Sequence, residues 1–159
     1  MKLIIIAAIG KNNELGLNND LIWHLKDDMK FFKETTTNHI IAMGYNTFNS
    51  LPHLLSNRKH IVFCNNNIKP INDVTLYSDI NKFLDDYKDT NESIFIIGGA
   101  SIYKYFISLA DELYITHIHS ESKADVFFPR IESNKYMLNI IKQGVENNIE
   151  YKIIHYIKE

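Results

Sequence analysis

The feature that most limits the fold is an alternation of short, isoleucine-rich apolar runs with amphipathic segments. The apolar runs, interpreted as buried strands, cover residues 3–9, 39–43, 60–64, 73–77, 94–97 and 113–118. The helix-like segments between them cover residues 25–35, 45–51, 79–87 and 101–109. Strands that are apolar on both faces and alternate with helices are typical of a mainly parallel central sheet flanked by helices. The sequence therefore predicts an α/β fold.

The C-terminal part follows a different pattern. Two further strand candidates, residues 136–143 and 149–157, come after Pro129 and are joined by a polar turn around residues 146–148. We expect them to form a C-terminal antiparallel hairpin added to the mainly parallel sheet. The 159 residues contain no internal repeat and no linker, so we expect a single domain over residues 1–159.

Charge, hydropathy and cysteine content exclude several classes of protein. The formal net charge is −2 and the lysines are interspersed with acids, so there is no basic stripe for nucleic acid. The apolar opening, residues 3–10, is far shorter than the roughly 20 residues of a membrane span. Cys64 is the single cysteine and cannot form an internal disulfide, which favours a reducing compartment. We expect a cytoplasmic protein with neither nucleic-acid nor membrane partners.

Two glycine-containing turns each link a predicted strand to a predicted helix. One is Gly98-Gly99-Ala100-Ser101, and the other is Gly44 followed by Asn46 and Thr47. Glycine lets a backbone approach a ligand closely, and free amides at the beginning of a helix favour phosphate. Each turn alone is better explained by a tight turn or a helix cap. The carboxyl ends of parallel strands meet at one edge of a sheet, so the two turns together favour a dinucleotide site.

Asp28 is an acid on the apolar side of a predicted helix. A turn of about 100° per residue places on that side Leu25, Met29 and Phe32. Asp28 falls within the same arc, whereas Asp27 points the other way, toward solvent. One interpretation of Asp28 is a first-turn acid favoured by the helix dipole. The other is a partly buried carboxylate, its pKa raised by burial, that binds a cationic or amidine-like group.

Arg58 is one of only two arginines among 17 basic residues. Where lysine is the usual cation, an arginine can mark a need for the flat, bidentate fork that grips a carboxylate. An ordinary surface arginine is the alternative. The polar segment 11–20, which follows the first strand, has the length and position of a lid or binding loop.

His117 and His119 lie two residues apart on a predicted strand, so one face of that strand could offer both to a metal ion. Neither cysteine nor an acid stands near them at metal-ligand spacing. We therefore expect solvent-facing histidines and no metal site.

Seven blocks of the sequence together resemble the dihydrofolate reductase family. In chain order they are IIAAIG, ELGLNNDLIWHLKDDMKFF, IIAMGYNTFNSL, NRKHIVF, IFIIGGASIYKYF, LADELYITHI and ADVFFP. No single block is specific, but their order and spacing cover essentially the whole chain. The resemblance implies an NADP-dependent oxidoreductase that transfers hydride from NADPH to 7,8-dihydrofolate. The product is tetrahydrofolate, which supports one-carbon metabolism and thymidylate synthesis.

The resemblance also implies roles for individual residues. Asp28 is implied as the catalytic carboxylate, Thr116 as the hydroxyl bonded to it, and Trp23 as the residue that holds an ordered water. Arg58 corresponds to the clamp on the glutamate α-carboxylate of the substrate. The other substrate-binding residues implied are Ile6, Ala8, Met29, Phe32, Leu51, Ile97 and Tyr103.

A cofactor site is implied in the same way. Its residues are Ala8, Gly16, Leu17, Gly44, Tyr45, Asn46, Thr47, Asn65, Ile97, Gly98, Gly99, Ala100, Ser101, Ile102 and Tyr103. The link between Gly98 and Gly99 matches a non-proline cis peptide of the family, and Asp125 matches an acid that supports the lid. The resemblance further implies a monomer that binds antifolate inhibitors.

Four positions depart from the family pattern. Ile22 and Lys26 stand where proline is frequent, so we expect a less preorganised lid and helix start. Tyr45 and Ser101 stand where many members carry a basic group toward the adenosine 2′-phosphate. The missing charge predicts weaker discrimination between NADPH and NADH, which makes NADH a second usable cofactor.

Two alternatives from other functional classes stay open. A reductase of another pterin or pyrimidine substrate, as in riboflavin synthesis, would share the fold but should lack the Asp28 and Arg58 pair. A non-catalytic nucleotide-binding module would bind NADPH tightly without turnover.

Overall fold

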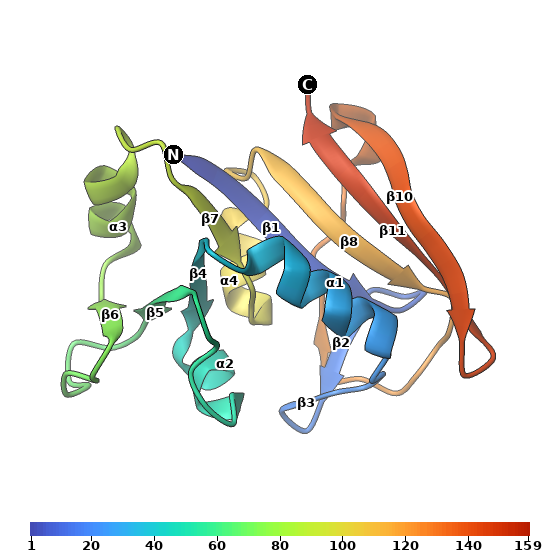
Figure 1. Cartoon of the computed structure of the whole chain (residues 1–159), viewed down its shortest axis with the longest axis horizontal. Helices are drawn as coiled ribbons and strands as arrows, with labels where there is room; N and C mark the ends of the chain where they lie inside the picture. Colours follow the sequence, from blue (N-terminus) through green and yellow to red (C-terminus); the bar gives the residue numbers. More distant parts are fainter.

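The computed structural model describes residues 1–159, which are organised around an eight-stranded sheet (Figure 1). In spatial order its strands are β10 (Tyr136–Glu146), β11 (Ile149–Lys158), β8 (Glu112–Ile118), β1 (Lys2–Ile9), β7 (Ser93–Ile96), β4 (Ile40–Gly44), β5 (Lys59–Phe63) and β6 (Val74–Tyr77). The strands from β8 to β6 pair in parallel. The β10–β11 hairpin joins them antiparallel. The predicted α/β fold with a C-terminal hairpin is confirmed.

Helices cover both faces of this sheet. They are α1 (Lys26–Thr36), α2 (Tyr45–Ser50), α3 (Ile80–Tyr87) and α4 (Ala100–Phe106), with a 3₁₀ turn η1 (Ser133–Lys135) before the hairpin. On one face, Leu3 and Ile5 of β1 pack with α3 and α4. On the other face, Ile4 and Ile6 pack with α1 and α2. Burial on both faces explains why β1 is a continuous apolar run instead of an alternating one. No helix is both long enough and apolar enough to cross a membrane.

Most predicted boundaries agree with the structure to within one or two residues. The predicted helix 101–109 is shorter, because α4 ends at Phe106 and residues 107–109 form a turn. The Asp79 carboxylate caps α3 by accepting a 2.9 Å hydrogen bond from the backbone N–H of Asn81, as its place before that helix suggests.

The polar segment 11–20 is not a plain loop. It forms β2 (Glu14–Leu17) and β3 (Asp20–Leu21), which pair with β9 (Val126–Phe127) in a second, three-stranded sheet. These strands are too short to show a hydrophobic period, and their partner lies more than a hundred residues away along the chain. Local sequence patterns therefore gave no signal for this small sheet.

Candidate active site

Asp28 lies in the first turn of α1 and faces β8. The Thr116 hydroxyl donates a 2.5 Å hydrogen bond to Asp28 Oδ1. Thr116 is 2% exposed and lies beside Ala8 in the pairing of β8 with β1. Burial raises the pKa of the Asp28 carboxyl, the Thr116 hydrogen bond lowers it in part, and the charge of Glu146 raises it further. A partly buried carboxylate, not a solvated first-turn acid, is what the structure shows.

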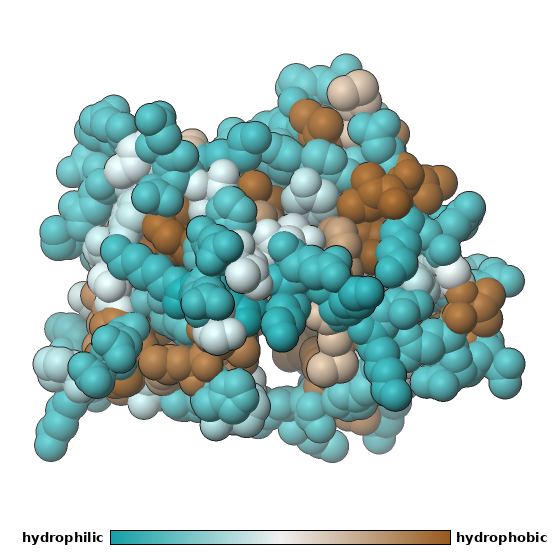
Figure 2. Space-filling model, viewed as in Figure 1, coloured by the Kyte–Doolittle hydropathy of each residue, from teal (hydrophilic) through white to brown (hydrophobic).

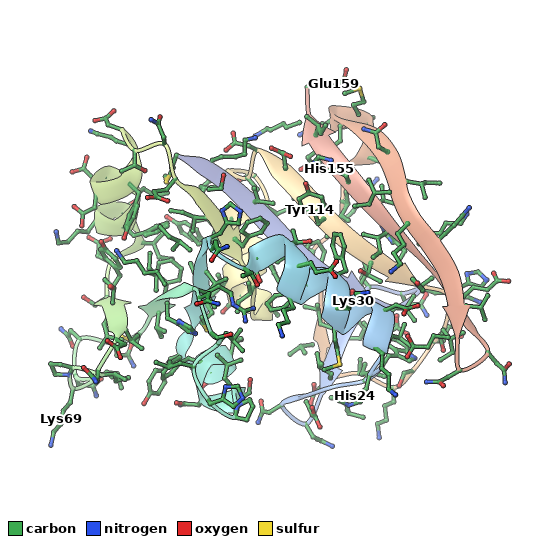
Figure 3. All side chains as sticks on the ribbon, in the orientation of Figure 1. His24, Lys30, Lys69, Tyr114, His155 and Glu159 are labelled. Atoms are coloured by element: carbon green, nitrogen blue, oxygen red, sulfur yellow. The ribbon has the colours of Figure 1, made fainter.

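Two other positions on α1 differ from the helical-wheel prediction. Met29 is 54% exposed, so it is not a core residue. Phe31 packs inward instead, against Tyr114, which is labelled beside α1 in Figure 3; their ring centroids are 5.8 Å apart. Asp27 does not face only solvent, because its Oδ2 accepts a 2.7 Å hydrogen bond from the Tyr151 hydroxyl. The hairpin supplies a second neighbour for α1 that a helical wheel does not include.

Apolar side chains form walls around the Asp28 carboxylate. Four of the predicted substrate-binding residues belong to one cluster between the sheet, α1 and α2: Ile6, Phe32, Leu51 and Ile97. Ala8 and Trp23 pack on a neighbouring cluster around Leu25, and Phe31 packs on both clusters. Figure 2 shows the surface hollowed below α1, with hydrophobic atoms gathered over α2 beside the hollow. A carboxylate among apolar side chains can orient a flat heterocycle by accepting hydrogen bonds from the N–H groups of the heterocycle.

Arg58 is anchored against the C-terminal end of α1. Its Nε donates to the Ser56 carbonyl at 2.9 Å, and its Nη1 donates to the Thr36 hydroxyl at 3.1 Å. Burial lowers the pKa of Arg58, although a guanidinium stays charged in proteins. A guanidinium has five N–H donors. The contacts with Ser56 and Thr36 use two of them, so other donors remain for an incoming carboxylate. These contacts give Arg58 a defined placement, and its role as a carboxylate clamp stays a prediction.

The buried His60 holds the turn that precedes Arg58. Its Nε2 accepts a 3.0 Å hydrogen bond from the Leu55 amide, so the proton is on Nδ1, which donates to the Arg58 carbonyl at 3.0 Å. Burial lowers the pKa of His60, and the nearby Arg58 charge lowers it further, so the neutral ring is favoured. No local sequence pattern identifies His60, because its role depends on two backbone groups of a nearby turn.

The two glycine turns meet at the carboxyl edge of the sheet. The Gly44 amide donates a 2.8 Å hydrogen bond to the Gly98 carbonyl, which joins the two turns directly. The peptide bond between Gly98 and Gly99 is cis, as the resemblance implies, and Gly98 has a φ of 130°. Neither α2 nor α4 has a side-chain cap. Uncapped amides beside glycine turns suit an anionic, phosphate-bearing ligand.

Most of the remaining predicted cofactor residues lie in the two helices that follow these turns. Those in the first turn of α2 are Tyr45, Asn46 and Thr47, and those in α4 are Ala100, Ser101, Ile102 and Tyr103. Tyr103 is buried, and its hydroxyl donates to the Ile6 carbonyl at 2.8 Å, which ties α4 to β1. Gly16 and Leu17 lie apart from them on β2 of the small sheet, and Asn65 is exposed after β5.

Two carboxylates hold the segments of the three-stranded sheet in place by accepting hydrogen bonds from backbone amides. Asp125 Oδ2 accepts from the Asn18 amide at 3.0 Å, which links the predicted lid to the segment before β9. Glu14 is 1% exposed and accepts from the amides of Asn12 at 2.6 Å and Ser122 at 2.8 Å. Burial alone would raise the pKa of Glu14, but hydrogen bonds from backbone amides outweigh it and lower the pKa. Nothing in the short ELGL run identified Glu14 as a buried acid.

The two neighbouring histidines, His117 in β8 and His119 just after it, differ from each other. His117 is half-buried, and its Nε2 lies 2.6 Å from the Tyr156 hydroxyl, whereas His119 is exposed. The expectation of two solvent-facing histidines is therefore wrong for His117. The reason is that β11 pairs with β8 and places Tyr156 opposite Leu113, from where the tyrosine hydroxyl reaches the His117 ring.

Known proteins resemble this chain over nearly its whole length. The family model described as dihydrofolate reductase matches residues 2–158. A dihydrofolate reductase of Bacillus subtilis is 36% identical over 157 residues, which cover 97% of this chain and 93% of the relative. A type 1 dihydrofolate reductase of Escherichia coli is 34% identical over 95% of each chain.

A solved structure of the same kind is also similar. Dihydrofolate reductase from Enterococcus faecalis, complexed with NADP(H) and RAB-propyl, superimposes with a TM-score of 0.88 at 29% identity. The match covers 99% of this chain and 96% of that one. Sequence and fold agree over nearly the whole length, and the chain belongs to the dihydrofolate reductase family.

Proposed function

We propose that the chain is a monomeric, single-domain enzyme that reduces 7,8-dihydrofolate to tetrahydrofolate with NADPH. The observation that carries this proposal is the Asp28 carboxylate, hydrogen-bonded to Thr116 and surrounded by the apolar walls of a cleft, in a member of the dihydrofolate reductase family. One-carbon metabolism and thymidylate synthesis are the processes that such a product supports. The same cleft is the proposed site for antifolate inhibitors.

Asp28 has two proposed roles toward the pterin ring. Its carboxylate accepts hydrogen bonds from the amino group and ring N–H, which fixes the ring between the apolar walls. Its raised pKa also brings it closer to the range in which a side chain can support proton delivery at neutral pH. Thr116 holds the carboxylate in place, and Trp23 is proposed to order the water through which the proton reaches the reacting nitrogen.

The substrate's tail is assigned to Arg58. Two of its nitrogens are engaged by Ser56 and Thr36, which fixes the plane of the guanidinium before substrate arrives. A guanidinium held in this way can grip the glutamate α-carboxylate with two parallel hydrogen bonds. His60 supports this geometry by holding the Arg58 carbonyl.

The glycine turns are the proposed cofactor site. A Cβ added to Gly99 would lie 3.3 Å from the Thr47 hydroxyl, and one added to Gly98 would lie 3.4 Å from the Tyr103 hydroxyl. The absence of side chains there keeps backbone and hydroxyl groups accessible to a flat or phosphate-bearing ligand. NADPH, when bound, supplies the hydride. The E. faecalis relative complexed with NADP(H) supports this assignment.

Tyr45 and Ser101 set the expected cofactor preference. Neither carries the positive charge that would pair with the adenosine 2′-phosphate. We therefore propose that NADPH is preferred but that NADH is also used, with a ratio of kcat/KM values below roughly a thousandfold. A larger ratio, measured with purified protein and saturating dihydrofolate, would contradict this proposal.

A cytoplasmic location is proposed from the single cysteine. Cys64 is free, and burial raises the pKa of its thiol, which favours the unreactive protonated form. Such a thiol suits a reducing compartment in which no disulfide is required.

The deciding experiment is NADPH oxidation by the purified chain, with and without dihydrofolate. We expect oxidation that depends on dihydrofolate and that is lost in Asp28→Asn. A parallel reaction with NADH measures the cofactor preference. A folded protein that binds NADPH without turnover would overturn the proposed reaction and favour a binding module. Turnover with another pterin or a pyrimidine but not with dihydrofolate would reassign the substrate.

A further inference from the structure

The beginning of α1 requires hydrogen-bond acceptors from elsewhere in the chain. Amides in the first turn of a helix have no partner within the helix, and a side chain at the N-cap often supplies one. The N-cap of α1 is Leu25, which has no such side chain. Lys26 adds to the requirement, because a proline at this position would carry no N–H. This same turn carries Asp28.

Glu146, at the end of β10, supplies the missing acceptors. One carboxylate oxygen accepts from the Lys26 amide at 2.7 Å, and the other accepts from the Asp27 amide at 2.9 Å. Figure 1 shows the β10–β11 turn next to the beginning of α1. Glu146 is 120 residues away from Lys26 along the chain, so this cap exists only in the folded protein.

A second contact joins the same two elements. The Tyr151 hydroxyl of β11 donates a 2.7 Å hydrogen bond to Asp27 Oδ2. Tyr151 is 3% exposed and packs with Leu25 in one core cluster. The hairpin therefore holds the first turn of α1 through three hydrogen bonds, two of them to Glu146.

We propose that Glu146 is a positioning residue for the reaction: from the hairpin it caps α1, fixes the placement of Asp28 and supplies a negative charge near that carboxylate. The inference rests on the proposed role of Asp28. It also explains how this chain defines the start of α1 with neither a capping side chain at Leu25 nor a proline at position 26. The negative charge is favourable where it lies, because the N-terminus of a helix attracts anions.

The charged and titratable groups around Asp28 come from several elements. Glu146 lies on the hairpin, Asp27 on α1, Tyr151 on β11 and Tyr103 on α4. Burial and the Asp27 hydrogen bond raise the pKa of Tyr151 to about 12, and burial raises the pKa of Tyr103 above its usual range, so both stay neutral. Glu146 and Asp27 are the acids among these groups, and the charge of Glu146 raises the pKa of Asp28. A change at Glu146 should therefore alter the pKa of Asp28 directly.

The test is an NMR titration of the Asp28 carboxyl carbon, assigned by its absence in Asp28→Asn. Glu146→Gln removes the charge but keeps the shape and one acceptor oxygen. We expect the Asp28 midpoint to move to lower pH in Glu146→Gln, because a nearby negative charge is removed. The matched control is Glu150→Gln, which removes the same charge from an exposed position on the same hairpin. We expect that control to leave the midpoint unchanged.

Glu146→Ala tests the cap separately. We expect hydrogen exchange of the Lys26 and Asp27 amides to become about tenfold faster, with exchange in β1 unchanged. The value of kcat/KM for dihydrofolate should fall about tenfold, while KM for NADPH stays constant. If Glu146→Ala does not fold, the exchange measurement is made on Glu146→Gln, where a smaller acceleration of the same two amides is expected.

The titration requires no turnover, so it can succeed or fail independently of the proposed reaction. An Asp28 midpoint that does not move in Glu146→Gln, or that moves equally in Glu150→Gln, would overturn the proposed electrostatic role. Unchanged exchange of the Lys26 and Asp27 amides would overturn the cap. Turnover failure in the unmodified chain would instead overturn the proposed function.

Discussion

The two halves of the proposed active site are constructed differently. The substrate half depends on side chains from distant elements, as in the hydrogen bond from Thr116 to Asp28, which are 88 residues apart. The cofactor half depends on backbone, where two local strand-to-helix turns meet through the Gly44 amide and the Gly98 carbonyl. We therefore expect substitutions that change charge to have their main effect on turnover and substrate binding in the substrate half. We expect substitutions that change backbone shape to have their main effect on cofactor binding in the cofactor half.

The largest expected effect is on the substrate half. Asp28→Asn keeps the size of the side chain and a hydrogen-bond acceptor for Thr116, but it removes the charge and the titration. We expect kcat for dihydrofolate reduction at neutral pH to fall by at least about a hundredfold. Steady-state kinetics with NADPH measures this loss. A variant with unchanged turnover would show that Asp28 is not the catalytic carboxylate.

The same substitution should stabilise the fold. Because folding raises the pKa of Asp28 above its ordinary value of 3.8, the folded chain keeps the proton to a higher pH than the unfolded chain. At a pH above the pKa of the folded state, the ionised carboxylate therefore lowers the free energy of unfolding. At a pH below the pKa values of both the folded and the unfolded state, the carboxyl is protonated in both states and has no such effect. We expect Asp28→Asn to increase the free energy of unfolding at neutral pH but not near pH 3, as measured by urea denaturation. An equal gain at both values of pH would contradict the burial of this charge.

A further prediction concerns the shape of the cofactor half. Gly98→Ala places a Cβ on a residue with a φ of 130°, which L-amino acids rarely adopt. We expect NADPH binding to weaken by about 1 to 3 kcal/mol, because the turn must change its conformation. Titration of protein fluorescence with NADPH measures the affinity. Gly99→Ala is the matched control, because Gly99 has an ordinary φ of −84° and should lose less affinity.

Another prediction concerns the tail of the substrate. Arg58→Lys keeps the charge but removes the planar fork, so we expect KM for dihydrofolate to rise about tenfold while kcat is retained. Arg130→Lys makes the same change at the other arginine, which is exposed, and should have no effect on KM. Equal KM values for the two variants would remove Arg58 from the substrate half.

The smallest expected effect concerns cofactor choice. Tyr45→Arg introduces a positive charge in the first turn of α2, near the proposed position of the 2′-phosphate. We expect the NADPH to NADH ratio of kcat/KM values to increase a few-fold, mainly through a lower KM for NADPH. Tyr45→Phe is the neutral control. If both variants change the ratio equally, shape and not charge sets the preference even here.

Much of the fold could be predicted because its signals are local. The continuous apolar run of β1 and the periodic apolar faces of the helices identify the α/β class. The glycine turns can be recognised because their glycines stand at the ends of apolar strand sequences. The proposed catalytic role of Asp28 rests on family resemblance, whereas the helical period predicts only its place on the apolar side of α1. Its position within an apolar arc was visible in the sequence, although Met29 in that arc is exposed.

The order of strands and helices along the chain and the residues that end each strand follow from neighbouring residues, so they can be predicted from sequence. The side chains that complete the site come together only when the chain packs. Glu146 caps α1, Tyr151 reaches Asp27, and Glu14 holds the small sheet, each across about a hundred residues or more. The physical reason is that hydrogen bonds require distances near 3 Å, which chain packing sets and no local period of a sequence records.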